Sequence, residues 1–272
     1  MTETIRDNGH EVEGILPTLG AERILAKDLT IKYGSHIVLK SLNVSVRAGE
    51  IVALMGRNGA GKRSLLTALV GLQKPDSGTS HICGKASADL KGKVRRDTVG
   101  FIPQEPSDLL YGQSVVGECA QGDKDNQIAP GTTFALLQRI VPSISPNTHP
   151  RDLSEGQRLA LALAIVLSAQ PQVLILDEPT RGLDYQSKAL LIGLLQNYSK
   201  ELGCCVLIAT HDVELVAELA DRVIFLADGE IVADGPTLDI LLSSPAFAPQ
   251  VAKVMSPRRW LTVSDVIAAM EE

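Results

Sequence analysis

One loop constrains what this chain can fold into more than any other feature. It follows an apolar run over residues 51–55 and precedes a helical pattern over residues 62–71; it reads Gly56, Arg57, Asn58, Gly59, Ala60, Gly61, Lys62, Arg63, Ser64. Gly56, Gly61 and Lys62 have the spacing of the phosphate-binding pattern G-x-x-x-x-G-K-[ST]. Its glycines let backbone N–H groups surround phosphates, the helix adds its positive end, and the lysine adds a charge. A ligand-free glycine-rich turn is the alternative, and the strand-then-helix context argues against it.

One position departs from the pattern. Arg63 stands where a Ser or Thr hydroxyl binds Mg²⁺, and Ser64 follows one place too late. A guanidinium has no acceptor and cannot ligate a metal ion. We expect Arg63 either to turn away or to contact phosphate oxygens, so that binding of a phosphate ligand survives while its metal-dependent hydrolysis falls. A shift of Ser64 into the role is disfavoured because a helix places it about 100° further round. A sporadic or engineered change is a third hypothesis.

The rest of the chain alternates strand and helix patterns. Apolar runs cover residues 51–55, 173–176, 206–209 and 223–226, and helical patterns cover 62–71, 155–169, 186–202 and 213–220. This order predicts an α/β fold with a mostly parallel sheet. Residues 24–33 and 39–46 alternate like half-buried strands. Residues 1–22 are predicted as a leader or linker, 23–245 as the main domain with a helical subdomain inserted at about 105–165, and 246–272 as a helical tail. One helix is expected within the insertion near residues 134–140, and residues 236–272 are read as two short helices around Ser256-Pro257.

Charge, apolar runs and cysteines limit the functional class. With 26 basic and 32 acidic residues the net charge is −6, which argues against a non-specific nucleic-acid binder. The most apolar run, residues 159–169, is far shorter than the roughly 20 residues of a spanning helix, and no signal-peptide pattern opens the chain. We therefore expect a cytoplasmic protein that reaches a membrane only through a partner. The cysteines show no CxxC spacing and are expected to be reduced core residues: Cys83, Cys119, Cys204, Cys205.

An acid pair supplies a second part of a phosphate site. Asp177 and Glu178 directly follow the apolar run 173–176. Asp177 stands where a Mg²⁺-holding carboxylate is expected, and Glu178 is placed to orient an attacking water. An exposed pair that only caps the next segment is the alternative, and the phosphate loop upstream disfavours it.

Further short motifs follow in a definite order. Residues 153–157, Leu-Ser-Glu-Gly-Gln, look like an LSGGQ signature with Glu155 in place of a glycine; Gln104, Asp184, His211 and Tyr33 look like the Q-loop, D-loop, switch and adenine-stacking residues. With these motifs the chain resembles the ATP-binding subunits of ABC transporters from about residue 24 to 245. Four of these residues have a structural alternative: Tyr33 as a strand aromatic, Gln104 as a solvated loop residue, Ser154 with Gln157 as a helix capping box, and His211 as a capping or structural histidine.

The resemblance implies a fold and a mechanism. The fold is that of a P-loop NTPase, a RecA-like sheet flanked by helices, with an antiparallel N-terminal β part and the helical insertion. The cofactors are ATP and Mg²⁺. The resemblance implies that Lys62 and the loop bind the phosphates and that Gln104 and Asp177 bind the metal ion. It implies that Glu178 and His211 act in hydrolysis. The resemblance also implies that two subunits pack head to tail. The partner's site is then completed by Ser154, Gly156, Gln157 and Asp184, and one chain alone has no complete site.

Softer matches suggest one branch of this family. Residues 101–111, 153–162 and 244–263 resemble the energy-coupling-factor importers of vitamins and transition-metal ions. The implied partners are a second ABC ATPase, identical or different, and a transmembrane coupling subunit, with no nucleic acid; the leader is then a candidate interdomain linker. The location implied by this resemblance is the cytoplasm, at the inner face of the cell membrane and bound there through the partner. A conventional ABC importer or exporter ATPase is the first alternative, and a non-transport ABC protein acting on ribosomes or DNA is the second.

Overall fold

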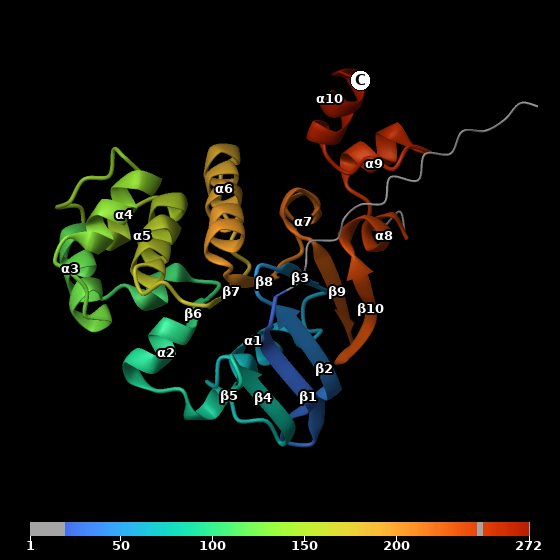
Figure 1. The fold of residues 1–272 in the computed structure, drawn as a ribbon, viewed down its shortest axis with the longest axis horizontal. Helices are drawn as coiled ribbons and strands as arrows, with labels where there is room; N and C mark the ends of the chain where they lie inside the picture. Colours follow the sequence, from blue (N-terminus) through green and yellow to red (C-terminus); the bar gives the residue numbers. More distant parts are fainter. Residues whose placement is uncertain (1–19, 244–246, 272) are drawn as a thin grey trace, which may run out of the picture.

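Two β-sheets organise the molecule. The computed structural model describes residues 20–243 and 247–271. The larger sheet has the order β10-β9-β3-β8-β7-β6 (Figure 1), with β3 Ile51–Met55, β6 Val99–Ile102, β7 Val173–Asp177, β8 Cys205–Ala209, β9 Arg222–Ala227 and β10 Glu230–Pro236. Its pairs are parallel except for the edge pair of β9 and β10. This arrangement confirms the predicted mostly parallel sheet.

The central strands of this sheet are buried on both faces. Every residue of β3, β7 and β8 is buried, as continuous apolar runs require between two layers. Ala209 at the end of β8 pairs with both Leu54 of β3 and Asp177 of β7. The loops that leave these three strands therefore meet at one edge of the sheet.

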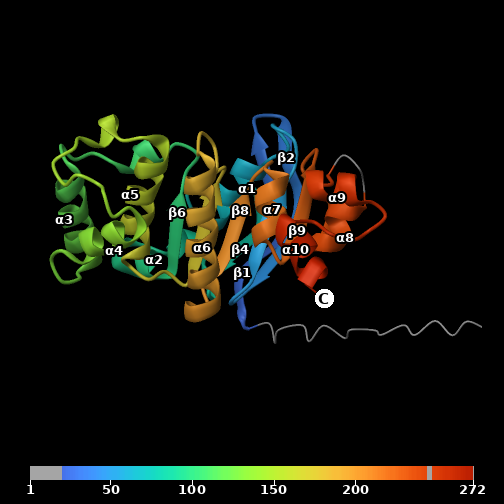
Figure 2. The same ribbon diagram turned by 90° about the horizontal axis from the view of Figure 1, so that it is seen from above.

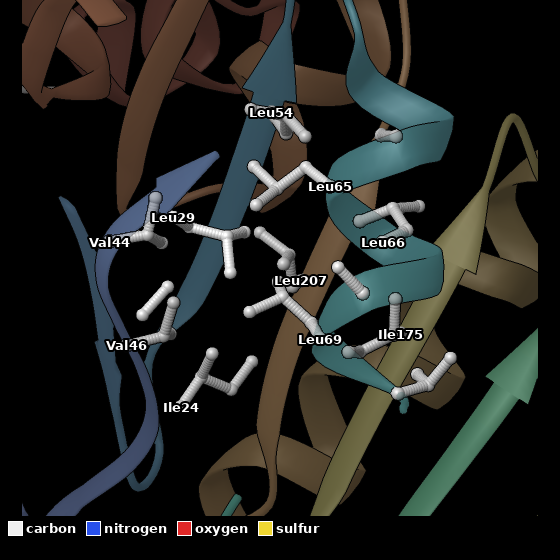
Figure 3. Close-up of a cluster of buried hydrophobic side chains, with 14 of the residues drawn as sticks. Ile24, Leu29, Val44, Val46, Leu54, Leu65, Leu66, Leu69, Ile175 and Leu207 are labelled. Carbon is white, nitrogen blue, oxygen red and sulfur yellow. The ribbon is translucent and has the colours of Figure 1, made fainter. Parts of the chain in front are cut away.

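The smaller sheet is antiparallel and covers one helix. Its order is β2-β1-β4-β5, with β1 Glu22–Tyr33, β2 His36–Arg47, β4 Ser77–Ile82 and β5 Lys85–Ala86. Helix α1, Lys62–Leu69, lies between the two sheets and buries Leu65, Leu66 and Leu69 (Figure 3). These side chains meet Ile24 and Leu29 on one side and Leu54 and Leu207 on the other. The predicted N-terminal antiparallel part is confirmed.

Helices cover the other face of the large sheet and extend beyond it. Helices α6, Tyr185–Leu202, and α7, Val213–Leu219, pack on it together with α5, Glu155–Leu167. Helices α3, Val115–Asn126, and α4, Thr132–Ile140, join α5 around a separate core that contains Leu137 and Leu161. Figures 1 and 2 show this helical group at one end of the molecule and the C-terminal helices at the other. Helix α2, Gly92–Thr98, precedes β6.

Some expected elements differ from those observed. The tail has three helices among the described residues, α8 Thr237–Leu242, α9 Gln250–Met255 and α10 Val263–Glu271, so the prediction of two was wrong. The sequence pattern did not predict helix α8 because this helix is stabilised by packing: Leu241 is buried in one cluster with Met55 and Val216. The insertion contains helix α3 in addition to the expected helix. Strands β4, β6 and β10 were not predicted, because their sequences show no clear alternation of apolar and polar residues. Of the predicted leader, residues 1–19 lie outside the described residues, and Glu22 already belongs to β1.

Within residues 20–243 and 247–271, every helix is too short or too polar to span a bilayer.

Candidate nucleotide site

Two glycines shape the loop after β3. Gly56 and Gly61 have φ angles of 151° and 104°, which side-chain-bearing residues rarely adopt. A Cβ at Gly61 would lie 2.6 Å from Leu39 Cδ2. Gly61 is also the N-cap of α1 and offers no side-chain oxygen to the first turn. The N–H groups of that turn therefore remain available to an anion.

Lys62 lies under the loop. Its side chain is 7% exposed, and Nζ donates a 2.7 Å hydrogen bond to Gly56 O. The same Nζ lies 3.8 Å from Glu178 Oε1. The loop after β3 and the acid pair after β7 are thus joined through one buried ammonium group.

Glu178 connects to the end of β8 as well. Its N–H donates to Ala209 O at 2.8 Å, and its Oε2 lies 2.8 Å from His211 Nδ1. Glu178 has a φ of 50°, a left-handed conformation that costs a non-glycine residue about 1–3 kcal/mol. Its carboxylate side chain is nevertheless only 11% exposed. The surrounding contacts hold an acid in a strained position beside a histidine, which is an arrangement typical of functional sites.

Arg63 contacts both residues that the sequence predicts as metal ligands. Its Nε donates a 2.9 Å hydrogen bond to Asp177 Oδ2, and its Nη2 donates to Gln104 Oε1. The Asp177 side chain is 5% exposed, whereas that of Arg63 is 63% exposed. One guanidinium therefore bridges the loop that follows β6 and the last residue of β7.

The contacts of Arg63 with Asp177 and Gln104 determine whether the oxygen atoms at this point can bind Mg²⁺. Magnesium requires several oxygen ligands at about 2.1 Å in a near-octahedral arrangement. Here the oxygens of Asp177 and Gln104 accept hydrogen bonds from a cation, and the residue after Lys62 offers no oxygen. The residues present therefore do not fit the ion in the predicted way, and the assignment of Asp177 and Gln104 as metal ligands stays a prediction.

These residues surround one cavity of about 690 Å³. It brings together most of the predicted residues, and it is lined by Val38, Arg57, Asn58, Gly59, Gly61, Lys62, Arg63, Ser64, Gln104, Asp177, Glu178, Arg181 and His211. Four of the lining side chains are cationic and two are carboxylates. The cavity is therefore positive without any metal ion, as an anionic ligand requires. Gly56 and Ala60 shape the loop from buried positions behind it.

Tyr33 lies beside the loop but does not line the cavity. Its ring is 55% exposed, and its hydroxyl donates a 2.9 Å hydrogen bond to Gln73 Oε1. The hydroxyl also lies 3.4 Å from Ser64 Oγ. Ser64 thus has its hydroxyl near Tyr33, and no recorded contact joins it to Asp177, so the arrangement does not favour a shift of Ser64 into the metal-binding role.

The signature residues lie at a different cavity, of about 280 Å³. Ser154 is the N-cap of α5 and forms a capping box with Gln157, with bonds of 3.2 and 3.1 Å. Gly156 faces α6, where an added Cβ would lie 2.5 Å from Ser187 Oγ. Asp184 caps α6, and the hydrogen bond from Ser187 N lowers the pKa of its carboxyl. Within one chain these residues do not line the phosphate-loop cavity. The capping box that was the structural alternative for Ser154 is present.

Sequence reasoning missed two charged residues near the site. Arg181 lines the loop cavity and pairs with Glu105 at 2.9 Å. Lys188 pairs at 2.6 Å with Asp212, the residue after His211. Arg181 follows the acid pair closely, and only this position could have indicated a place in the site. Nothing in the sequence indicated a role for Lys188, because its partner is distant along the chain.

Known proteins resemble this chain at the level of sequence. A family model described as ABC transporter matches residues 39–181. A protein of Streptomyces coelicolor named as an ABC transporter ATP-binding protein is 53% identical over 249 residues, which cover 90% of this chain and 43% of that protein. An energy-coupling factor transporter ATP-binding protein of Methanocaldococcus jannaschii is 35% identical over 221 residues, 79% of each chain. The chain spans less than half the length of the Streptomyces relatives it matches.

A solved structure resembles the fold. It is a dimeric ATP-binding cassette in a post-hydrolysis state, bound to ADP and inorganic phosphate. Its TM-score is 0.70 at 27% identity, and the match covers 79% of this chain and 98% of that one.

Proposed function

This chain belongs to the ABC transporter ATP-binding family, and from that premise we propose that it is an ATP-binding ATPase subunit that powers transmembrane uptake of a small solute. One observation carries the proposal. The loop after β3, the acid pair at the end of β7 and the histidine after β8 converge on one positive cavity that also includes Lys62.

The proposed roles follow from these positions. Lys62 and the backbone of residues 56–61 hold the outer phosphates, with Arg57, Asn58 and Gly59 at the rim and Tyr33 against the adenine. Glu178 is the candidate base, because its carboxylate is buried and lies beside His211. The role we propose for His211 is to contact the terminal phosphate.

The signature residues complete a second chain's site. Ser154, Gly156 and Gln157, together with Asp184, lie at the N-terminal ends of α5 and α6 and line a cavity apart from the phosphate loop. A capped helix N-terminus still presents a positive dipole to an anion. In a head-to-tail dimer each nucleotide lies between one loop and the other chain's signature. The dimeric solved relative supports this arrangement.

The proposed partners are a second ABC ATPase and a transmembrane coupling subunit of the energy-coupling-factor type. The relative of that type, which matches over 79% of both chains, supports this branch. The cargo is a vitamin or a transition-metal ion, and the chain works at the cytoplasmic face of the membrane. The alternative is a subunit of a conventional ABC importer or exporter, which differs in its partner and not in its nucleotide site.

Two measurements test this function. Calorimetry of the purified chain measures ATP binding, with Lys62→Ala as the control that removes the buried cation; equal affinity in both would contradict the assigned site. Affinity purification from solubilised membranes, with mass spectrometry, then identifies the partners. A multi-span membrane protein recovered with a second ATPase supports transport, whereas recovery of ribosomes or DNA contradicts it.

A further inference from the structure

Arg63 occupies a position with two unusual properties. It lies in the first turn of α1, directly after the phosphate-binding lysine, and it bonds at once to Asp177 and Gln104. These two side chains come from the ends of β7 and β6, so the guanidinium sits where three loops meet. A planar guanidinium presents five N–H donors in a rigid fork and matches such a set of oxygens well.

The buried carboxylate requires a cation at this point. A carboxylate that is only 5% exposed is costly unless it is paired and hydrogen-bonded. Arg63 supplies both the charge and the hydrogen bond from within the chain. Asp177 is thus satisfied before any ligand arrives.

A divalent ion would have to undo this arrangement. It would need to break the Arg63–Asp177 ion pair, and it would gain no hydroxyl ligand from the residue after Lys62. It would also add two positive charges to a cavity whose cationic side chains already outnumber its carboxylates. Magnesium gives up its hydration water reluctantly, so these terms act together against it.

The same guanidinium is suited to a phosphate. Two of its donors contact Asp177 and Gln104, and its other N–H groups have no recorded partner among the described residues. Arg63 lines the cavity next to Lys62 and the loop backbone. Arginine and phosphate oxygens form charge-assisted hydrogen bonds that need no metal.

We propose that the Arg63 guanidinium takes the place of the metal ion in this chain's own site, which therefore holds a nucleoside triphosphate without a divalent cation and does not hydrolyse it. This inference rests on the proposed function, because it assumes ATP at this loop. Hydrolysis then requires a partner ATPase that differs from this chain, with a Ser or Thr after its loop lysine, and this chain completes that partner's site with its signature residues.

The test compares ATP affinity with and without magnesium. Calorimetry is run on the full chain in excess EDTA and in excess Mg²⁺, for the natural protein, Arg63→Ser, Arg63→Ala and Arg181→Ser. Arg181 is the matched control: it lines the same cavity, its side chain is 60% exposed, and its partner is Glu105 instead of Asp177. Circular dichroism checks that each variant is folded.

The natural chain and Arg181→Ser are each expected to have the same ATP affinity in EDTA as in Mg²⁺, whatever loss Arg181→Ser causes in both buffers. Arg63→Ser is expected to bind about tenfold more weakly in EDTA and to recover in Mg²⁺, because a hydroxyl and a free Asp177 become ligands. Arg63→Ala should lose the EDTA affinity and recover less. If the natural chain binds ATP about tenfold more tightly in Mg²⁺ than in EDTA, the inference is wrong and the proposed function stands. If it binds ATP in neither buffer, both fail. The natural chain alone can thus overturn the inference, even where a variant does not fold.

Discussion

At the scale of single residues, Tyr33 is separable from the phosphate loop. Its ring is half exposed at the end of β1, and its hydroxyl bonds to Gln73. Stacking on a base is worth about 1–3 kcal/mol, so Tyr33→Ala should weaken ATP and GTP binding by roughly tenfold or more while leaving inorganic triphosphate binding nearly unchanged. Titrations with the three ligands measure this. Tyr33→Phe keeps the ring and should bind like the natural protein; an equal loss for triphosphate would show a structural effect.

Glu178 is a residue whose role depends on its neighbour Arg63. In the natural chain Glu178→Gln should change hydrolysis little, since this site is inferred not to hydrolyse. In an Arg63→Ser background, assembled with its partner subunits, Glu178→Gln should remove the hydrolysis gained, roughly a 10²–10⁴-fold effect, and keep ATP binding. Steady-state phosphate release and calorimetry separate the two. Undiminished turnover in the double variant would exclude Glu178 as the base.

At the scale of elements, one ion pair holds the loop after β8 to α6. Burial alone would raise the pKa of the Asp212 carboxyl, but hydrogen bonds from Lys188 and from Leu215 N–H lower it below its usual value. A carboxyl whose folded pKa is lowered adds stability above its unfolded pKa, near 3.9, and loses it as the pH falls through the folded pKa.

Asp212→Asn keeps the helix cap but removes the charge, so it should lower the free energy of unfolding by about 1 kcal/mol at pH 7 and by much less at pH 3. Urea unfolding at both pH values measures the difference. Asp97→Asn, in the exposed pair with Lys93, is the matched control and should cost less at pH 7. A loss for Asp212→Asn that is the same at both pH values would contradict the ion-pair explanation.

At the scale of the whole molecule, Arg222 joins the two sheets. From β9 it bonds to Asp234 of β10, to Ser45 O of β2 and to Glu50, whose side chain is 4% exposed. The paired carboxylates raise the pKa of Arg222. Arg222→Met should destabilise the fold by about 3–5 kcal/mol because it leaves Glu50 buried without a cation.

Chemical denaturation measures this cost, and Glu50→Gln added to Arg222→Met should recover part of it. Arg259→Met, which removes an exposed partner of Asp239, should change stability by less than about 1 kcal/mol. A small effect of Arg222→Met would mean that water reaches Glu50.

The separation of the two half-sites leads to a prediction for the isolated chain. The signature residues and the phosphate loop line different cavities, so a monomer should lack a complete site. A strictly monomeric preparation of the natural chain or of Arg63→Ser, checked by light scattering, should hydrolyse ATP no faster than Lys62→Ala. Turnover clearly above that control would contradict a shared site.

The sequence by itself determined what depends on neighbours along the chain. The loop of residues 56–64, the buried runs of β3, β7 and β8 and the capping box of Ser154 and Gln157 all follow from local spacing, since backbone conformation, strand burial and helix caps act over a few residues. The predicted mostly parallel sheet and the antiparallel N-terminal part were therefore confirmed. The domain boundaries and the roles of the site residues stay predictions.

Only the tertiary structure decided which contacts the distant site residues make with one another. Arg63 and Asp177 are 114 positions apart, and Arg63 reaches Gln104 as well, because the parallel register brings the ends of β3, β6 and β7 to one edge of the sheet. The sequence indicated that Arg63 cannot ligate Mg²⁺, because a guanidinium has no acceptor, but it left open where the Arg63 side chain points. Helix α8 was likewise decided by burial of Leu241 against distant strands. Contacts of this kind depend on how loops converge in space, and no local pattern encodes that convergence.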